Sequence, residues 1–271
     1  MYSANCLYSE RIKVIKMKKI IFPVLIAAFL CASLFGCSGE KKYKLVEVPE
    51  ELQINTQSLS EDPAKLLDYN EDYPLFFAEP ESDVYAYVCS NQSDNGILVK
   101  FDGYIQYFSW RMLTPTIAKP DVHVADYNND GLQDIAVTVL SNVGETNYNE
   151  DLHILMNRDG SLEDCLYTHE TCAIDAKGIL TFSENNTKDD SYFFFINGKR
   201  QEIEIKNKGD FFGMYFDAVQ DFTLGNTITV EVVPGLSFSD SAIPDYSLAT
   251  FCADINYNNG VFEMSNPAVE Y

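Results

Sequence analysis

Oxygen-bearing side chains recur in the nine residues from Asp126 to Asp134, at positions 1, 3, 5 and 9 of that segment. These side chains belong to Asp126, Asn128, Asp130 and Asp134. Leu132, at position 7, would add its backbone carbonyl, and Gly131 allows the sharp turn that brings both arms together. Calcium prefers about six to eight oxygen ligands at roughly 2.3–2.6 Å. The spacing therefore predicts a calcium-binding loop.

The residues on either side of this loop indicate strands. An EF-hand would need a glutamate at position 12 and a helix on each side, but position 12 is Val137. The segments 121–125 and 135–140 are short and rich in β-branched residues, which is typical of strands. The alternative to a calcium loop is a solvated turn, because Asp, Asn and Gly also favour ordinary turns.

The arrangement of strand, acidic loop and strand resembles the FG-GAP/VCBS repeat of integrin-like β-propellers and many bacterial surface proteins. Asp126, Asn128, Asp130, Gly131 and Asp134 match the loop of that family, and residues 135–137 fit its following strand. The resemblance covers about residues 119–141. It implies a structural calcium ion and names no biochemical activity.

The N-terminal region has the features of a bacterial lipoprotein signal. Lys18 and Lys19 precede an apolar run, residues 20–34. The following Leu-Phe-Gly-Cys37 resembles a lipobox, in which the cysteine is acylated and becomes the mature N-terminus. This predicts a chain anchored in the lipid bilayer of a bacterial cell membrane through Cys37 and facing outside the cytoplasm. We expect translation to start at Met17, with residues 1–16 preceding the signal. The alternative is an uncleaved membrane anchor, although the run is short for a span.

The composition after the signal excludes some partners. Residues 37–271 carry 14 basic and 40 acidic residues, a net charge of −26. Such a surface repels nucleic acid, so we expect no nucleic-acid partner. Abundant aromatic residues (17 Tyr and 18 Phe in the whole chain) indicate a packed core.

Four cysteines follow Cys37, and no zinc or redox motif contains them. An extracytoplasmic location permits disulfides, and Cys165 and Cys172 are close enough in sequence to bridge a short loop. Cys89 and Cys252 could join the first and last strands. Buried free thiols are an equal alternative, because spacing does not determine connectivity.

The remaining sequence predicts a mainly β fold. Residues 37–75 are expected to form a tether, with a short helix from Ser60 to about Tyr69. Residues 76–271 are expected to form an antiparallel meander or sandwich-like domain. Its hairpins are signalled by Asx-Gly pairs at residues 102–103, 159–160, 197–198 and 259–260. A small or degenerate β-propeller is the alternative, although only one calcium loop is present.

Other candidate chemistry in the sequence is weak. No nucleophile motif occurs, and His123, His153 and His169 lack metal-ligand spacing, so we expect structural roles for them. Trp110 is expected in the core. The polar segment from Ser141 to Glu150 is expected to be a surface loop that could carry binding.

These features favour a non-catalytic, calcium-stabilised binding or adhesion module with an unknown protein or glycan ligand. The alternatives are an envelope hydrolase that uses paired carboxylates, or an envelope assembly or sensor component with a protein partner.

Overall fold

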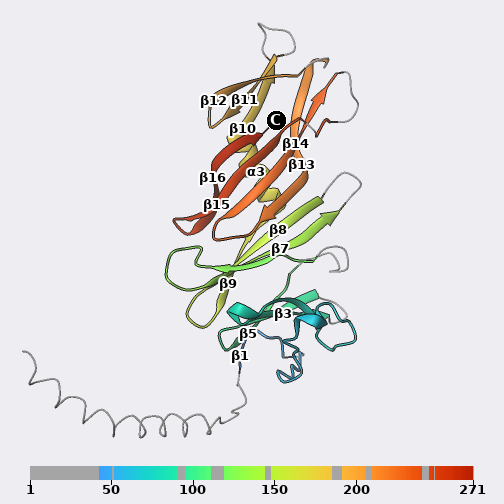
Figure 1. Cartoon of the computed structure of the whole chain (residues 1–271), viewed down its shortest axis with the longest axis vertical. Coiled ribbons are helices and arrows are strands. Elements are labelled where there is room, and N and C mark those ends of the chain that lie inside the picture. Colours follow the sequence, from blue (N-terminus) through green and yellow to red (C-terminus); the bar gives the residue numbers. More distant parts are fainter. Residues whose placement is uncertain are drawn as a thin grey trace, which may run out of the picture. The chain divides into compact units, whose positions relative to one another are not determined.

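The computed structural model describes residues 43–50, 52–90, 95–110, 119–143, 148–184, 191–205, 209–239, 244–246 and 248–270 (Figure 1). The chain divides into residues 1–42 and a compact unit from Tyr43 to Tyr271. The signal segment and Cys37 lie outside the described residues. Within the described part, no helix has the length and apolar character needed to cross a membrane.

The first sheet of the compact unit has five strands in the order β1-β5-β4-β3-β2. β1 runs parallel to β5, and the other neighbours are antiparallel. One 3-10 turn, η1 (Pro63–Lys65), precedes β2, and a second, η2 (Pro80–Ser82), connects β2 to β3. The strands are β1 (Lys44–Val46), β2 (Leu75–Glu79), β3 (Val84–Ser90), β4 (Asn95–Phe101) and β5 (Tyr104–Phe108).

The second sheet has eight strands and carries the predicted calcium loop. Its order is β16-β15-β14-β13-β8-β7-β6, with β9 also paired to β8. The β8–β13 junction is parallel, whereas the other pairs are antiparallel. The strands are β6 (Val122–Ala125), β7 (Asp134–Val143), β8 (Tyr148–Asn157), β9 (Leu162–Tyr167), β13 (Phe211–Thr223), β14 (Ile228–Phe238), β15 (Thr250–Asn258) and β16 (Val261–Glu270).

A helix and a small third sheet complete the described fold. Helix α3 (His169–Ile179) follows β9 and leads directly into β10 (Leu180–Glu184). β10 forms an antiparallel sheet with β11 (Ser191–Ile196) and β12 (Lys199–Glu204). The Thr168 side chain caps α3 by accepting a hydrogen bond from the backbone N–H of Thr171.

Strand β7 is buried on both faces, and this explains how the elements are layered. Ile135, Val137 and Val139 pack with residues of the five-stranded sheet. Ala136, on the opposite face, belongs to the core shared with α3 and the three-stranded sheet. Because successive strand residues point to opposite faces, the nearly continuous apolar sequence of β7 serves two cores.

The mainly β, antiparallel-rich architecture predicted from the sequence is confirmed. The four Asx-Gly pairs all lie in hairpin turns, and both residues of each pair have positive φ angles, such as 48° at Asn197 and 74° at Gly198. That geometry is the reason for the Asx-Gly preference. The described sheets have five, eight and three strands, so they are not the repeated, equal blades of a propeller.

The structure corrects the assignment of residues 43–75 to a tether. Tyr43, Leu52 and Ile54 pack against one side of the five-stranded sheet, and Leu59 is buried there. Lys100 of β4 is buried, pairs with Glu61, and lies over the ring of Tyr43. The segment is folded because its scattered apolar residues cover a sheet face that would otherwise be exposed. The helix expected from Ser60 to Tyr69 is limited to η1.

Candidate functional site

The segment from Asp126 to Asp134 forms a closed turn between β6 and β7. The Asp126 carboxylate accepts hydrogen bonds from the backbone N–H groups of Asp130 (3.1 Å) and Gly131 (2.9 Å). Asp130 accepts one from Leu132 at 2.9 Å, and Asn128 accepts one from Asp130 at 2.9 Å. The oxygen-bearing side chains of the loop thus hold its backbone in place.

Asp134 is the buried member of the loop, with 0% of its surface exposed. Its two carboxylate oxygens accept hydrogen bonds from the backbone N–H groups of Tyr127 (3.0 Å) and Asn157 (2.9 Å). Burial raises the pKa of Asp134 above its ordinary value, and the two N–H donors oppose that rise. Asp134 therefore joins the loop to the end of β8.

The loop offers the right donors for calcium but in an open arrangement. Two oxygens on one calcium ion can lie at most about 5 Å apart, since each bond is roughly 2.3–2.6 Å long. Among the described residues, Asp126, Asp130 and Asp134 do not form a group with one ligand atom each inside 4.8 Å. Asp126 and Asp130 would therefore have to turn towards the buried Asp134, with Asn128 and the Leu132 carbonyl completing the set.

The cysteines predicted as a possible pair are free thiols in the structure. Cys172 lies in α3 and is buried in the core, and Cys165 lies in β9 against the same core. The possible Cys165–Cys172 disulfide is therefore not formed. Of the two alternatives, a disulfide and free thiols, the structure has free thiols. Cys89 and Cys252 are also free. Burial raises the pKa of Cys172 to about 12, which suppresses thiolate formation.

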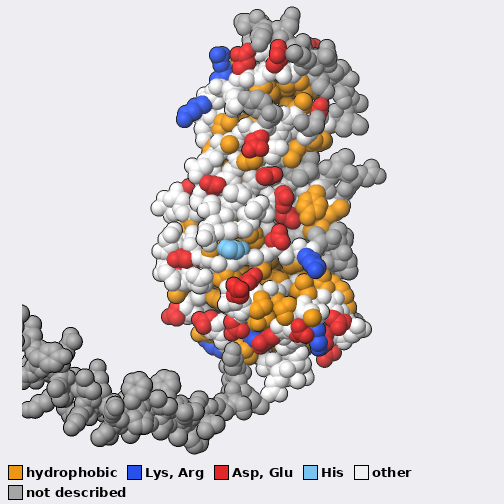
Figure 2. All heavy atoms as spheres, in the orientation of Figure 1, with side chains coloured by type: hydrophobic (Ala, Val, Ile, Leu, Met, Phe, Trp, Pro, Cys, Tyr) orange, Lys and Arg blue, Asp and Glu red, His pale blue; other side chains and the backbone are white. Residues whose placement is uncertain are grey.

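A pocket of about 630 Å³ lies between the end of β5, the middle of the eight-stranded sheet and the start of α3. Most of its lining residues are polar, and the full set is Ser109, Trp110, Ser141, Asp151, His153, Asp164, Leu166, Thr168, His169 and Glu170. Acidic side chains are spread over the face of the molecule seen in Figure 2, with few lysines and arginines among them. The pocket volume of about 630 Å³ is in the range of small-ligand sites.

One wall of this pocket is a stack of Trp110 on His153. The ring centroids are 4.0 Å apart with an interplanar angle of 24°. Asp164 accepts a hydrogen bond from the Trp110 indole at 2.8 Å, and its Oδ2 lies 2.9 Å from Nδ1 of His153. Trp110 is 4% exposed, which agrees with the core position expected for it. The stack and the shared carboxylate make this wall rigid.

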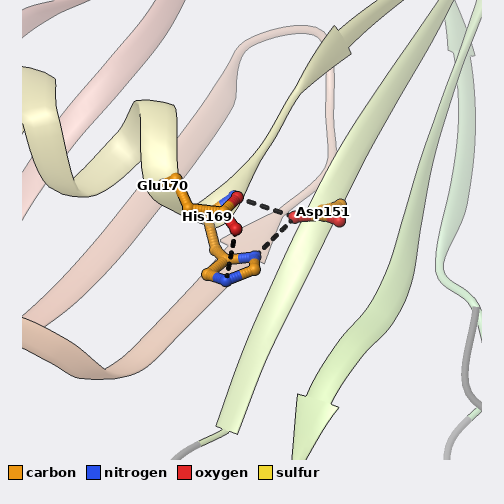
Figure 3. A group of neighbouring side chains, drawn as sticks. All are labelled: Asp151, His169 and Glu170. Carbon is orange, nitrogen blue, oxygen red and sulfur yellow. Dashed lines mark hydrogen bonds and ion pairs between the residues drawn. The ribbon is translucent and has the colours of Figure 1, made fainter. Parts of the chain in front are cut away.

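Asp151, His169 and Glu170 also line this pocket and lie together (Figure 3). Asp151 projects from β8 and accepts hydrogen bonds from the backbone N–H of His169 at 2.8 Å and from its ring at Nδ1, 2.9 Å away. Nε2 of the same ring lies 3.3 Å from a carboxylate oxygen of Glu170. The ligand atoms of these three side chains all lie within 4.8 Å of one another.

The contacts of the His169 ring limit the chemistry of this group of side chains. Ser141 Oγ lies 3.2 Å from Nδ1, the nitrogen that also contacts Asp151. A serine–histidine–aspartate relay instead needs the serine and the carboxylate on different ring nitrogens. Asp151 and Glu170 face different nitrogens of the ring. The arrangement suits hydrogen bonding to a ligand.

The sequence did not indicate that these residues meet. His153 is buried in a strand, as expected, but its stacking on Trp110 links residues 43 positions apart. The segment from Ser141 to Glu150 is not one long loop, because β7 extends to Val143 and β8 begins at Tyr148. Residues 144–147 lie outside the described part. Two features of the sequence could have revealed α3. Thr168 is a good N-cap residue, and the small apolar residues Cys172 and Ala176 are four positions apart, on one face of a helix.

Comparison with known proteins gives no relative from which a function could be transferred. No family model, no curated protein and no solved structure matches this chain.

Proposed function

We propose that this chain is a membrane-anchored extracytoplasmic lipoprotein whose β domain is a non-catalytic binding module stabilised by calcium. Cys37 would carry the acyl anchor, and residues 43–271 would form the module. Asp126, Asn128, Asp130, Asp134 and the Leu132 carbonyl would hold the ion. Its role would be structural, because neutralising three carboxylates removes their mutual repulsion in one short turn.

The observation that carries this proposal is the closed turn between β6 and β7. Four oxygen-bearing side chains in calcium-loop spacing belong to this turn, and backbone N–H groups already orient Asp126 and Asp134. An ordinary solvated turn has no need for a fully buried carboxylate. Arg158 Nη1 is 3.9 Å from Oδ2 of Asp130. At this distance the guanidinium would compete only weakly with a calcium ion for the Asp130 carboxylate.

Binding rather than catalysis is supported by the 630 Å³ pocket. Its polar groups are fixed by strands and by the start of α3, as in a preformed ligand site. Nδ1 of His153 and both ring nitrogens of His169 contact carboxylates. Ser141 Oγ donates to the Asn149 carbonyl at 3.1 Å, which directs its proton away from His169.

Thermal melting of the chelator-treated full chain, with and without millimolar calcium, tests the proposal. A ligand that binds only the folded state raises the melting temperature, so we expect a rise with calcium and no comparable rise with magnesium. The rise should disappear in Asp126→Asn. The calcium-dependent rise should persist in Asp159→Asn. This control makes the same substitution in the Asp159-Gly160 turn, where oxygen-bearing side chains do not have the spacing of a calcium loop. A melting temperature indifferent to calcium would refute the calcium-stabilised module.

A further inference from the structure

A second pocket, of about 440 Å³, lies on the other side of the His169–Glu170 pair. Its walls are largely apolar and are formed by Ala173 and Ile174 of α3 and by Met214, Tyr215 and Phe216 of β13. Ile174 and Tyr215 are exposed in spite of their size. The calcium loop contributes nothing to this pocket, so the two sites can be tested separately.

Two buried amides line this pocket side by side. Asn149 of β8 and Gln220 of β13 are register partners at the parallel junction of these strands, so their side chains share a face. They are 2% and 1% exposed. Neither Oδ1 of Asn149 nor Oε1 of Gln220 has a hydrogen-bond partner.

The orientation of the Gln220 amide follows from its other contact. Its Nε2 donates a hydrogen bond to the carbonyl of Phe216 at 2.9 Å. Because a carbonyl can only accept, the nitrogen must face Phe216, and the oxygen must face away from it. Buried polar atoms without partners are rare, and each one requires an explanation. Two residues that line one pocket each have a buried acceptor without a donor, and a ligand that donates hydrogen bonds would supply the donors.

Electrostatics identify the kind of donor. The backbone carbonyl of Asn149 accepts a hydrogen bond from Ser141 Oγ, which lies 3.2 Å from Nδ1 of His169. β8 therefore passes close to the first turn of α3 at this point, and Glu170 lines the same pocket as the two amides. Lys177, a cation on the rim, is about two helical turns further along α3. The amide end thus presents acceptors and a carboxylate. The acidic domain as a whole attracts cations.

We propose that this pocket binds a small compound that has an apolar body and a primary ammonium group. The ammonium lies beside Glu170 and donates to Asn149 Oδ1 and Gln220 Oε1. Both oxygens are buried in the structure, so the two amide side chains turn toward the pocket on binding. The apolar body lies against Ile174, Met214 and Tyr215. This inference rests on the proposed function, since it gives the binding module a ligand class.

The test is isothermal titration of the full chain in detergent micelles with 2-phenylethylamine as the probe. The controls are 2-phenylethanol, which lacks the charge, and 3-phenylpropionate, which reverses it. Hydrogen bonds from a charged donor are about twice as strong as neutral ones. We therefore expect the amine to bind at least about tenfold more tightly than the alcohol, and the acid not to bind. Equal affinities for amine and alcohol would overturn the proposal.

A variant locates the site. Gln220→Met keeps the length of the side chain and removes the acceptor, so the affinity for the amine should fall at least about tenfold. Gln201→Met, the same change on β12 outside the pocket, should leave the affinity unchanged. If Gln220→Met does not fold, Asn149→Leu removes the neighbouring acceptor and serves the same purpose. Unchanged amine affinity in the folded variant would refute the assignment to this pocket.

The outcomes for the two proposals are distinguishable. Loss of amine selectivity with an intact calcium-dependent melting shift would refute only the ammonium site. Amine binding that is abolished by Gln220→Met, together with a melting temperature indifferent to calcium, would refute only the calcium-stabilised scaffold.

Discussion

The indole Nε1 of Trp110 lies 2.8 Å from Oδ2 of Asp164, and this hydrogen bond ties the end of the five-stranded sheet to β9 of the eight-stranded sheet. The same carboxylate contacts His153, on which Trp110 stacks. Asp164 therefore satisfies two buried donors from different parts of the chain. One side chain thus supports the wall of the polar pocket and adds a hydrogen bond to the apolar contact between the two sheets.

Replacing Asp164 by leucine should destabilise the fold by about 2–3 kcal/mol, because it leaves the buried indole N–H and the His153 ring without their partner. Glu163→Ala is the control on the same strand. Its exposed ion pair with Arg158 should be worth at most about 1 kcal/mol. Trp110 is the single tryptophan of the chain, so its fluorescence during urea unfolding measures both. Equal losses for the two variants would contradict the role given to Asp164.

Asp134→Ala should destabilise the protein by about 2–4 kcal/mol, with or without calcium. The substitution leaves the backbone N–H groups of Tyr127 and Asn157 without a hydrogen-bond acceptor. Asp130 is exposed, so Asp130→Ala should cost much less in the presence of a chelator. Urea unfolding in chelator separates the structural role of Asp134 from ion binding. The account of this loop fails if Asp134→Ala is as mild as Asp130→Ala.

Stability should depend on pH through Glu150. Burial, and then the nearby Asp221 carboxylate, raise the pKa of Glu150 to about 7, although the Phe222 N–H and the Tyr148 hydroxyl favour the ionised form and Asp121 disfavours it. The folded protein therefore holds this proton more tightly than the unfolded chain, whose glutamates titrate near pH 4.5. The stabilisation is complete below about pH 4.5 and is lost as the pH rises to about 7.

Glu150→Gln removes this titration, so its stability relative to the parent protein should improve from pH 4.5 to pH 8, by on the order of 3 kcal/mol. Glu231→Gln, an exposed change on β14, should show a nearly constant difference over the same range. Urea unfolding at several pH values gives both curves. A flat difference for Glu150→Gln would show that Glu150 is not held as a buried acid.

Cys37→Ser should abolish acylation and release the chain from the membrane fraction, because no other residue of the lipobox can form the thioether. Incorporation of labelled fatty acid and fractionation of cells measure the two effects. Cys89→Ser, which changes a buried thiol of the compact unit, is the control and should stay labelled. Fatty acid incorporation that survives Cys37→Ser would contradict lipidation at this residue.

Local signals in the sequence were enough to predict most of the strands. The Asx-Gly turns and the alternating β-branched residues act over a few positions, so they can be recognised without the rest of the chain. The apolar run of β7 predicted a strand but not that its two faces serve two cores. That assignment depends on which sheets pack against it.

The parts that could not be predicted depend on long-range contacts or on weak periodicity. Within helix α3, only Cys172 and Ala176 are buried, which leaves little amphipathic pattern to detect. The Trp110–Asp164 bond joins residues 54 positions apart, and Asn149 meets Gln220 only because β8 and β13 pair in parallel. The ligand spacing of Asp126 to Asp134 was visible because all its members lie in one short segment.

Calcium titration of the chelator-treated full chain by calorimetry tests the central claim most directly. The account predicts saturable binding of one ion per chain, lost or weakened at least about tenfold in Asp126→Asn and retained in Asp159→Asn. Absence of binding at millimolar calcium, or binding that is equally strong in Asp126→Asn, would contradict it.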